Sequence, residues 1–383
     1  MKILFLEWPC YGADNWIAEL KKQGYDVDNM KVSSISDEED FDFQNKLSAI
    51  ILEKKYDILC SFNFFPVISI IAKKVCKKYI AWVYDSPSLH MHSVEINNSC
   101  NYVFIFDKCK YQEFIDRGIK TVYYLPLAGV SEMKDILDTK TNNDYCSDIT
   151  FVGSLYRRNN FYDQINYLPE KIKGYLEGIM ESQRKIYGYY MIPELLYDDT
   201  LNEIKRYVTL DLGEGFFVDD REVFASMFLA KKIANKERES MLIKLAEYFE
   251  VDLYSDENFV SKNIKNHGSV PYGVEMYRLF HNSKININST LRCIRTGINL
   301  RTMDILSAGG FCITNYQEEL SEHFDIGKEI IVYESELDLI EKTAYYLKHE
   351  DTRKEIAHKG RERIIKSHNY ENRIREMMNI VLN

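Results

Sequence analysis

The sequence predicts an α/β protein built from two doubly wound domains, in which parallel sheets are covered by helices on both faces. Short apolar runs rich in Ile, Val, Phe and Tyr alternate with helical patterns in both halves of the chain. At 383 residues the chain is too long for one ordinary hydrophobic core. Its 45% hydrophobic and 13% aromatic content is ample for packed cores and excludes a disordered protein.

The N-terminal third supplies the first sheet. An apolar run, KILFL, begins at Lys2 and precedes a helix that starts near Asp14. A second strand candidate, YDILCSF, begins at Tyr56 and leads to a helix from about Pro66. Three more strand candidates follow: YIAWVYD from Tyr79, NYVFIFD from Asn101 and TVYYLPL from Thr121. We therefore expect an N-terminal domain over residues 1–133.

The second sheet begins after a polar stretch, 134–148, that we interpret as a linker or a surface crossing. Its first strand candidate is DITFV, and the region 159–238 that follows is mostly helical. Strands resume further on: VDLYS from Val251, KININ from Lys284, GFCIT from Gly310 and KEIIVY from Lys328. These patterns predict a second domain over residues 148–360 with a helical segment at about 159–238.

Charge, the length of apolar runs and the spacing of cysteines argue against several classes of protein. The chain has 49 Lys and Arg against 59 Asp and Glu, a net charge of −10, which argues against a general affinity for nucleic acids or anionic membranes. The first apolar run is too short for a signal peptide and is interrupted by Glu7. No run approaches the roughly 20 apolar residues of a membrane helix, so we expect a cytoplasmic protein. The eight cysteines are scattered and predict free thiols rather than a metal site.

The segment 290–316 carries the most chemistry. It has a loop with Arg292 and Arg295, a turn at Gly297, and a short helix that places Arg301 and Asp304 on one stripe among apolar residues. Charges in a mostly buried helix need partners. A ligand with phosphates at one end and hydroxyls at the other would supply them, because helix N-termini and arginines bind anions. Alternatively, the two charges only neutralise each other as a structural pair.

Other motifs are weaker by themselves. No G-x-G-x-x-G follows the first strand and no G-x-x-x-x-G-K-[ST] occurs, which argues against a nicotinamide dehydrogenase or a P-loop NTPase. Gly153 and Ser154 end the strand DITFV, where backbone can approach a ligand closely or simply turn. Tyr272, after a proline, can stack on a base or merely pack.

Candidates for acid–base chemistry lie in the first half. Asp85 ends the strand AWVYD, where a carboxylate can accept a proton from an acceptor hydroxyl or can cap the next element. His90 and His92 follow in a short polar loop and are second choices for the same role.

The ordered set of motifs AWVYDSP, NYVFIFDK, VYYLPLA, SDITFVGSLYRRN and GINLRTMDILSAGGFCITNY resembles the GT-B glycosyltransferases. More specifically, it looks like the CgeB-type, spore maturation protein-like group. The resemblance extends from about Tyr56 to Arg375 and is weakest between about 159 and 238. It implies two Rossmann-like domains facing across a cleft, a C-terminal domain that binds a nucleotide-sugar, and an N-terminal domain that holds the acceptor. It also implies that the last helix, 361–383, returns to the N-terminal domain.

The resemblance further implies roles for individual residues. Asp304 would bind the ribose hydroxyls where many relatives have glutamate, and Tyr272 would lie near the base. Arg292 and Arg295 would lie over the diphosphate, with Gly297, Asn299 and Arg301 at the helix start. Neither a metal nor a cofactor is implied, since basic side chains and the helix N-terminus stabilise the leaving group.

We therefore expect metal-independent, inverting transfer of a sugar from a nucleotide-sugar to a hydroxyl of a protein or glycan, with Asp85 as base. The family resemblance favours a UDP-linked donor that carries GlcNAc or glucose. Neither the acceptor nor the oligomeric state follows from the sequence. The alternatives are a nucleotide-sugar epimerase or sugar phosphorylase on the same scaffold, and a non-catalytic binding or coat protein.

Overall fold

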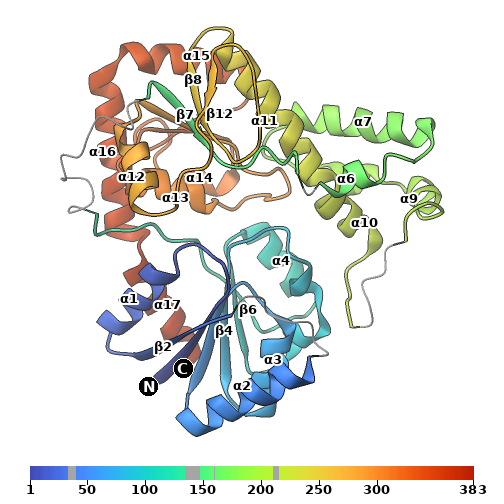
Figure 1. Cartoon of the computed structure of the whole chain (residues 1–383), viewed down its shortest axis with the longest axis vertical. Coiled ribbons are helices and arrows are strands. Elements are labelled where there is room, and N and C mark those ends of the chain that lie inside the picture. The colour runs from blue at the N-terminus through green and yellow to red at the C-terminus, as the bar shows by residue number, and fades with distance from the viewer. Residues whose placement is uncertain (33–39, 134–146, 159, 210–214) are drawn as a thin grey trace. The chain divides into compact units, whose positions relative to one another are not determined.

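The computed structural model describes residues 1–32, 40–133, 147–158, 160–209 and 215–383. It divides into two compact units (Figure 1). The first contains the described residues of Met1–Ala128, Leu212–Val218 and His368–Asn383, and the second those of Gly129–Asp211 and Asp219–Ser367. Most of the expected linker, residues 134–146, lies outside the described residues. Each unit contains a six-stranded parallel sheet, which confirms the α/β fold class.

The sheet of the first unit has the strand order β2-β1-β3-β4-β5-β6, with every pair parallel. Its strands are β1 Lys2–Glu7, β2 Asp26–Lys31, β3 Ile58–Phe62, β4 Lys78–Val83, β5 Asn101–Ile105 and β6 Val122–Tyr124. The central strand β3 is buried at every position, as expected where helices cover both faces. The edge strand β2 buries only Val27, and so lacks the apolar run that marks the other strands.

Helices α2, α4 and α17 of the first unit begin after residues whose side chains cap them. Asp40 accepts from the Phe43 N–H at 2.9 Å, and Asp107 accepts from the Cys109 N–H at 3.1 Å. The helices are α1 Ala13–Lys22, α2 Phe41–Lys54, α3 Pro66–Lys74, α4 Lys108–Asp116 and α17 Tyr370–Leu382, with 3₁₀ turns η1 Leu89–His92 and η2 Val94–Asn97. The C-terminal helix α17 packs against α1 within this unit.

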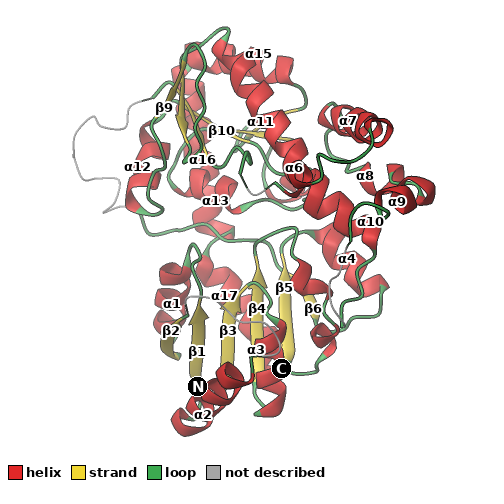
Figure 2. Cartoon of the chain, turned by 45° about the vertical axis from the view of Figure 1, so that its right-hand side comes forward, coloured by secondary structure: helices red, strands yellow, loops and turns green. Residues whose placement is uncertain are grey.

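The sheet of the second unit has the order β12-β11-β10-β7-β8-β9, again parallel throughout. Its strands are β7 Ile149–Val152, β8 Val251–Tyr254, β9 Ile264–Asn266, β10 Ile285–Asn288, β11 Cys312–Asn315 and β12 Ile331–Tyr333. Figure 2 shows the strands of each unit among their flanking helices. Strands β8 and β9 are added on one side of β7, and strands β10, β11 and β12 on the other, so the strand order switches between β7 and β10. In such folds ligands bind beyond the carboxyl ends of the strands at this point.

Helices of the second unit fall into two groups. Those that flank its sheet are α11 Ala230–Ala246, α12 Val274–Asn282, α13 Leu300–Ser307, α14 Glu318–His323, α15 Glu336–Lys348 and α16 Glu350–Ser367. Those that form the helical insert are α6 Phe161–Gln164, α7 Glu170–Arg184, α8 Ile192–Leu195, α9 Asp198–Ile204, α10 Asp220–Val223 and the π-helix η3 Phe224–Leu229. The insert has its own apolar core, which includes Leu176, Ile204 and Phe224.

Helix α16 runs on through Gly360, where a helix boundary was expected, and ends at Ser367. Gly360 is a packing residue, because an added Cβ would come within 2.4 Å of the Glu329 carbonyl oxygen. The break before α17 falls instead at His368, and Asn369 caps the new helix through the Asn372 N–H at 2.9 Å. Among the described residues, no helix combines the length and apolarity that crossing a bilayer requires.

Candidate functional site

A buried polar network at the carboxyl ends of β10 and β11 fixes the start of α13. The side-chain amide of Asn288 donates to the hydroxyls of Thr302, at 3.1 Å, and Thr314, at 2.8 Å. Asn299 caps α13 by accepting from the Thr302 N–H at 3.1 Å. Because these polar groups are buried and satisfied by one another, they hold the first turn of α13 against the sheet.

The loop that leads into α13, residues 289–299, is anchored at intervals along its length. Its anchors are Arg238 to the Ser289 carbonyl, Asn315 to the Thr290 N–H at 2.7 Å, Gln317 to the Ile294 carbonyl at 2.9 Å and Glu319 to the Thr296 hydroxyl at 2.6 Å. Such a loop has little freedom to move. Because the family resemblance implies that the donor diphosphate lies here, we call residues 289–299 the donor loop hereafter.

Asp304 is a buried carboxylate surrounded by tyrosines. The hydroxyls of Tyr272 and Tyr277 each donate to its Oδ1 at 3.2 Å. Burial raises the pKa of Asp304 to about 6, although the charge of Arg301 and the two tyrosine hydrogen bonds act in the opposite direction. The nearby charge and hydrogen bonds thus offset only part of the effect of burial on the pKa, and carboxylates with such a raised pKa are frequent in functional sites. Tyr272 and Arg301 thus both lie beside Asp304.

Arg301 lies one turn before Asp304 and is the more exposed of the two. Its Nη1 is 3.7 Å from Asp304 Oδ2, and the side chains are 26% and 4% exposed, respectively. The guanidinium also contacts the Met276 sulfur and lies 5.5 Å from the centre of the Phe280 ring. The two charges therefore do pair. However, the pair is longer than a hydrogen bond and leaves the guanidinium partly open to solvent, where it can meet an anion.

The loop after β7 donates several hydrogen bonds to one carboxylate, that of Glu257. Gly153 adopts φ +153°, and the Ser154 hydroxyl donates to Glu257 at 2.9 Å. The backbone N–H groups of residues 155, 157 and 158 also donate to Glu257. Burial alone would raise the pKa of Glu257, but these hydrogen bonds hold it below its usual value. These backbone N–H groups and the Ser154 hydroxyl are therefore already paired, and the Gly153 N–H donates to the Tyr254 carbonyl at 3.1 Å.

Arg292 departs from the expected position over a diphosphate. It is buried, donating to Glu237 from Nε at 3.1 Å and from Nη2 at 2.7 Å, and its guanidinium lies 3.6 Å from the centre of the Tyr187 ring. Because Glu237 already neutralises its charge, we remove Arg292 from the donor-binding set. Arg295 remains half-buried, near the hydroxyls of Tyr189 and Tyr190, and Gly297 is buried in the same loop.

In the first unit, Asp85 is exposed just beyond β4. The Asn63 side-chain amide donates to Asp85 Oδ2 at 2.7 Å, while its oxygen accepts from the N–H groups of Tyr84 and Asp85 at 3.0 and 3.1 Å. Asn63 itself has φ +60°, a conformation that asparagine tolerates better than most residues. Asn63 therefore orients the Asp85 carboxylate at the carboxyl end of the sheet.

The two histidines after Asp85 lie in different environments. His90 is exposed, with its ring 5.4 Å from that of Phe65. His92 is buried, and its ring lies 5.3 Å from Phe114 and 5.5 Å from Phe217. This burial argues against His92 as the base, since an acceptor hydroxyl needs direct access to it.

Several residues of the site have no clear signal in the sequence. Glu237 and Arg238 lie in a run, KERES, that is typical of an exposed helix face, yet both are buried. Arg238 donates to the carbonyls of Ser154 and Ser289, and so joins the loops after β7 and β10. Tyr277, by contrast, was accessible to sequence reasoning, because it lies next to Met276 and one turn before Phe280 on the apolar face of α12. The described side chains include no group of three or more His, Cys, Asp or Glu that could hold a metal ion.

Comparison with known proteins finds a family match in the C-terminal part of the chain. Residues 232–379, which contain Tyr272, Arg301 and Asp304, match a family model described as "Glycosyl transferase-like". No curated protein matches the chain at a significant level.

Solved structures match over almost the whole chain at low identity. A glycosyltransferase from Rickettsia africae is 11% identical, with 99% of this chain and 97% of that chain covered and a TM-score of 0.53. A sucrose-phosphate synthase from Thermosynechococcus elongatus is 9% identical, with 99% and 98% covered and a TM-score of 0.54. A UDP-forming α,α-trehalose-phosphate synthase from Burkholderia xenovorans is 11% identical, with 100% and 98% covered and a TM-score of 0.53. The chain therefore has the two-domain GT-B fold, and its C-terminal part is glycosyltransferase-like in sequence.

Proposed function

We propose that this protein is a glycosyltransferase that moves a sugar from a nucleoside-diphosphate sugar to a hydroxyl of a protein or glycan acceptor. The observation that carries the proposal is the buried carboxylate of Asp304, beside a partly exposed Arg301, at the helix that follows an anchored loop. This cluster lies inside the region that matches the glycosyltransferase-like family. The order of the sequence motifs supports the CgeB-type group within that class.

In the proposed reaction, Asp304 accepts hydrogen bonds from the ribose hydroxyls and Tyr272 lies near the base. Arg301, Arg295 and the N-terminus of α13, capped at Asn299 and preceded by Gly297, stabilise the negative charge of the departing diphosphate. Gly153 allows close approach of backbone from the loop after β7. Because these groups supply the positive charge, we propose that transfer needs neither a metal ion nor a cofactor. UDP linked to GlcNAc or glucose is the proposed donor.

We propose that Asp85 is the base. An acceptor oxygen attacks the anomeric carbon while the bond from that carbon to the diphosphate oxygen breaks, and the acceptor's proton passes to the Asp85 carboxylate. The nucleoside diphosphate leaves with the bonding electron pair. Direct displacement of this kind inverts the anomeric configuration. The contact from Asn63 supports the assignment, because it holds the carboxylate in one orientation.

The first test is thermal unfolding of the purified protein with UDP-, dTDP- and GDP-sugars in the presence of EDTA. A ligand at a hundredfold excess over its dissociation constant stabilises the folded state by about 2.7 kcal/mol, which is readily detected. We expect stabilisation by one nucleotide family, reduced in an Arg301→Ala variant. A shift that requires metal would contradict metal-independent binding. No shift with any nucleotide would favour the non-catalytic coat protein.

A second test separates transfer from epimerisation. The protein is incubated with the stabilising nucleotide-sugar without acceptor, and the sugar is analysed for a changed configuration. We expect no epimer, and expect nucleoside diphosphate to be released faster when a hydroxyl acceptor is added. Formation of an epimer without acceptor would establish the alternative enzyme class.

A further inference from the structure

Tyr187, Arg292 and Glu237 join three segments of the second unit that are distant in sequence. Tyr187 follows α7 in the helical insert, Glu237 lies in α11, and Arg292 lies in the donor loop. The Arg292 and Glu237 side chains are each 3% exposed and form a two-pronged ion pair. The Tyr187 ring covers the guanidinium at 3.6 Å from its centre. Both the ion pair and the stacking depend on the planar shape of the arginine.

This arrangement controls the part of the loop that leads to the proposed donor site. Arg292 is seven residues before Asn299, the residue that caps α13. Beyond Arg292, the next anchors of the loop are at Ile294 and Thr296. Arg292 is therefore one of several anchors of the short segment that ends at the cap of α13, and it is the one that the helical insert reaches.

The ion pair is a poor device for stability alone. Removing two charges from water costs much of what their attraction returns, and apolar residues of similar volume often serve a core as well or better. What a buried, two-pronged pair does provide is one defined geometry, because any other arrangement leaves a charge unpaired. The pair joins α11 to the donor loop, and the Tyr187 ring adds the helical insert to the same contact.

We propose that Tyr187, Arg292 and Glu237 form a latch through which the helical insert holds the donor loop in its ligand-binding position. All three are positioning residues, and none touches the donor. The use of the latch in donor binding rests on the proposed glycosyltransferase function. The proposal also assigns the helical insert a task, which is to supply the aromatic face of the latch.

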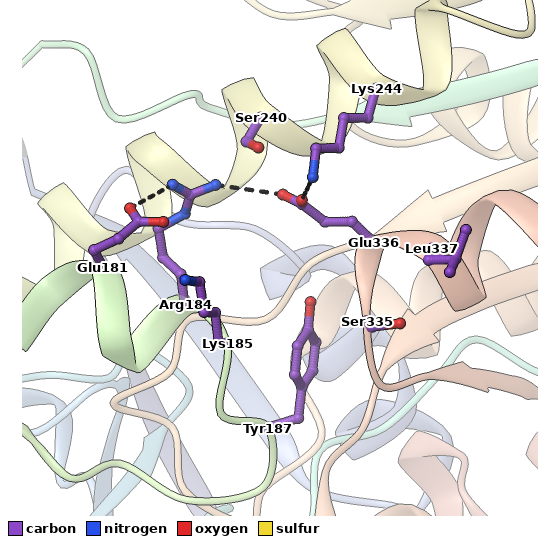
Figure 3. A pocket seen from close by; sticks show the side chains of 9 residues that line it. All are labelled: Glu181, Arg184, Lys185, Tyr187, Ser240, Lys244, Ser335, Glu336 and Leu337. Atoms are coloured by element: carbon purple, nitrogen blue, oxygen red, sulfur yellow. Dashed lines mark hydrogen bonds and ion pairs between the residues drawn. The ribbon is translucent and has the colours of Figure 1, made fainter.

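Tyr187 is the best position for a test. It borders a surface hollow of about 400 Å³ that is also lined by Arg184, Lys244 and Glu336 (Figure 3). Removing its ring enlarges this hollow without changing either partner of the buried ion pair, so we expect Tyr187→Ala to keep the fold. Tyr187→Phe keeps the ring, and Arg292→Lys keeps the charge but loses the flat fork. Tyr197→Ala removes an exposed tyrosine of the same insert and serves as the matched control.

The experiment combines amide hydrogen exchange of the free protein with calorimetric binding of UDP-glucose. In Tyr187→Ala and Arg292→Lys we expect faster exchange in the donor loop, with protection retained in the strands. We expect their dissociation constants to rise roughly three- to thirtyfold, the range seen for coupled positions. Tyr197→Ala should behave like the parent protein in both measurements, and Tyr187→Phe should lie closer to the parent than Tyr187→Ala because it keeps the ring over the guanidinium.

The outcomes separate the latch from the proposed function. Unchanged exchange in the donor loop of folded Tyr187→Ala and Arg292→Lys overturns the latch. Faster exchange throughout the second unit, with binding per folded molecule unchanged, shows a general packing role and also overturns it. If the parent protein binds no nucleotide-sugar while donor-loop exchange responds as expected, the latch stands and the proposed function fails.

Discussion

The Arg301 guanidinium lies 3.7 Å from the Asp304 carboxylate, one turn apart on α13, and the carboxylate is much the more buried partner. This asymmetry suits a site in which the acid binds neutral hydroxyls in a closed position and the arginine meets an anion near solvent. Two tyrosine hydroxyls complete the environment of the acid.

Replacing Arg301 by alanine should lower turnover by well over tenfold without unfolding the protein. A charge-assisted hydrogen bond to a phosphate contributes about 1.5–3 kcal/mol, and Arg301 is only partly buried, so the fold loses little. Steady-state transfer kinetics and thermal unfolding measure the two effects. Arg301→Lys, which keeps the charge, should recover part of the loss. Unchanged turnover in Arg301→Ala would remove the arginine from the phosphate site.

Donor affinity should rise as the pH increases through about 6. The folded-state pKa of Asp304 is about 6, and only the ionised carboxylate accepts hydrogen bonds from hydroxyls with both oxygens. Calorimetry with UDP-glucose is preferable to free UDP, whose terminal phosphate itself titrates near this pH. In Asp304→Asn the affinity should be weaker and independent of pH in this range. A pH dependence that persists in Asp304→Asn would assign it to another group.

Asp304 should also make stability fall as the pH rises from about 4 to 7. Its pKa in the folded protein lies above the unfolded value of 3.8, so the folded state binds more protons between these two values. Each pKa unit corresponds to 1.36 kcal/mol, which makes the total penalty roughly 3 kcal/mol at neutral pH. Compared with the parent protein, Asp304→Asn should therefore gain relative stability with increasing pH. Denaturant unfolding at pH 4.5 and 7.5 measures this difference, and the opposite trend would contradict the raised pKa.

Changing Asp85 to asparagine should abolish transfer while leaving donor binding intact. The substitution removes the proton acceptor but keeps the size of the side chain beside Asn63. Transfer assays and UDP-glucose calorimetry on the same preparation separate the two effects. His90→Gln is the matched comparison, since His90 is exposed in the same region and should be dispensable. If His90→Gln is inactive and Asp85→Asn active, the role of base passes to His90.

Two helical glycines should respond in opposite directions to alanine. Gly174 in α7 is exposed with no atom within 4 Å of an added Cβ, so Gly174→Ala should stabilise by about 1 kcal/mol through helix propensity. Gly360 in α16 gains the same propensity, but its Cβ would meet the Glu329 carbonyl at 2.4 Å and Leu306 at 2.9 Å. Gly360→Ala should therefore destabilise, by about 1–3 kcal/mol. Thermal unfolding compares them, and a stabilising Gly360→Ala would contradict this packing of α16.

The fold class was predictable because its evidence is local. In strands such as β3 and β4, an apolar run marks burial on both faces and no knowledge of partners is needed. The edge strands β2 and β9 were not predicted, also because the evidence for strands is local. Each is short or buried at a single position, and so carries no such run.

In the candidate site, too, only relationships between residues close in sequence were predictable. Arg301 and Asp304 are three residues apart, and helical geometry alone brings them onto one stripe. The partner of Arg292 is 55 residues away in a helix whose charges look solvent-exposed in the sequence. The Glu257 carboxylate accepts hydrogen bonds from the backbone of a loop about a hundred residues earlier in the chain. Neither relationship has a local signature.

The sequence by itself determined the periodicities of this protein, and with them its two parallel sheets, its helical insert and the stripe that carries Arg301 and Asp304. Only the tertiary structure decided which charges are neutralised inside the fold and which stay partly open to solvent. Arg292 and Arg301 are alike as residues and lie nine positions apart, yet one is neutralised by Glu237 and covered by Tyr187 while the other stays partly exposed. The reason is physical: the role of a charge depends on its burial and its partner, and both are set by where distant segments of the chain meet.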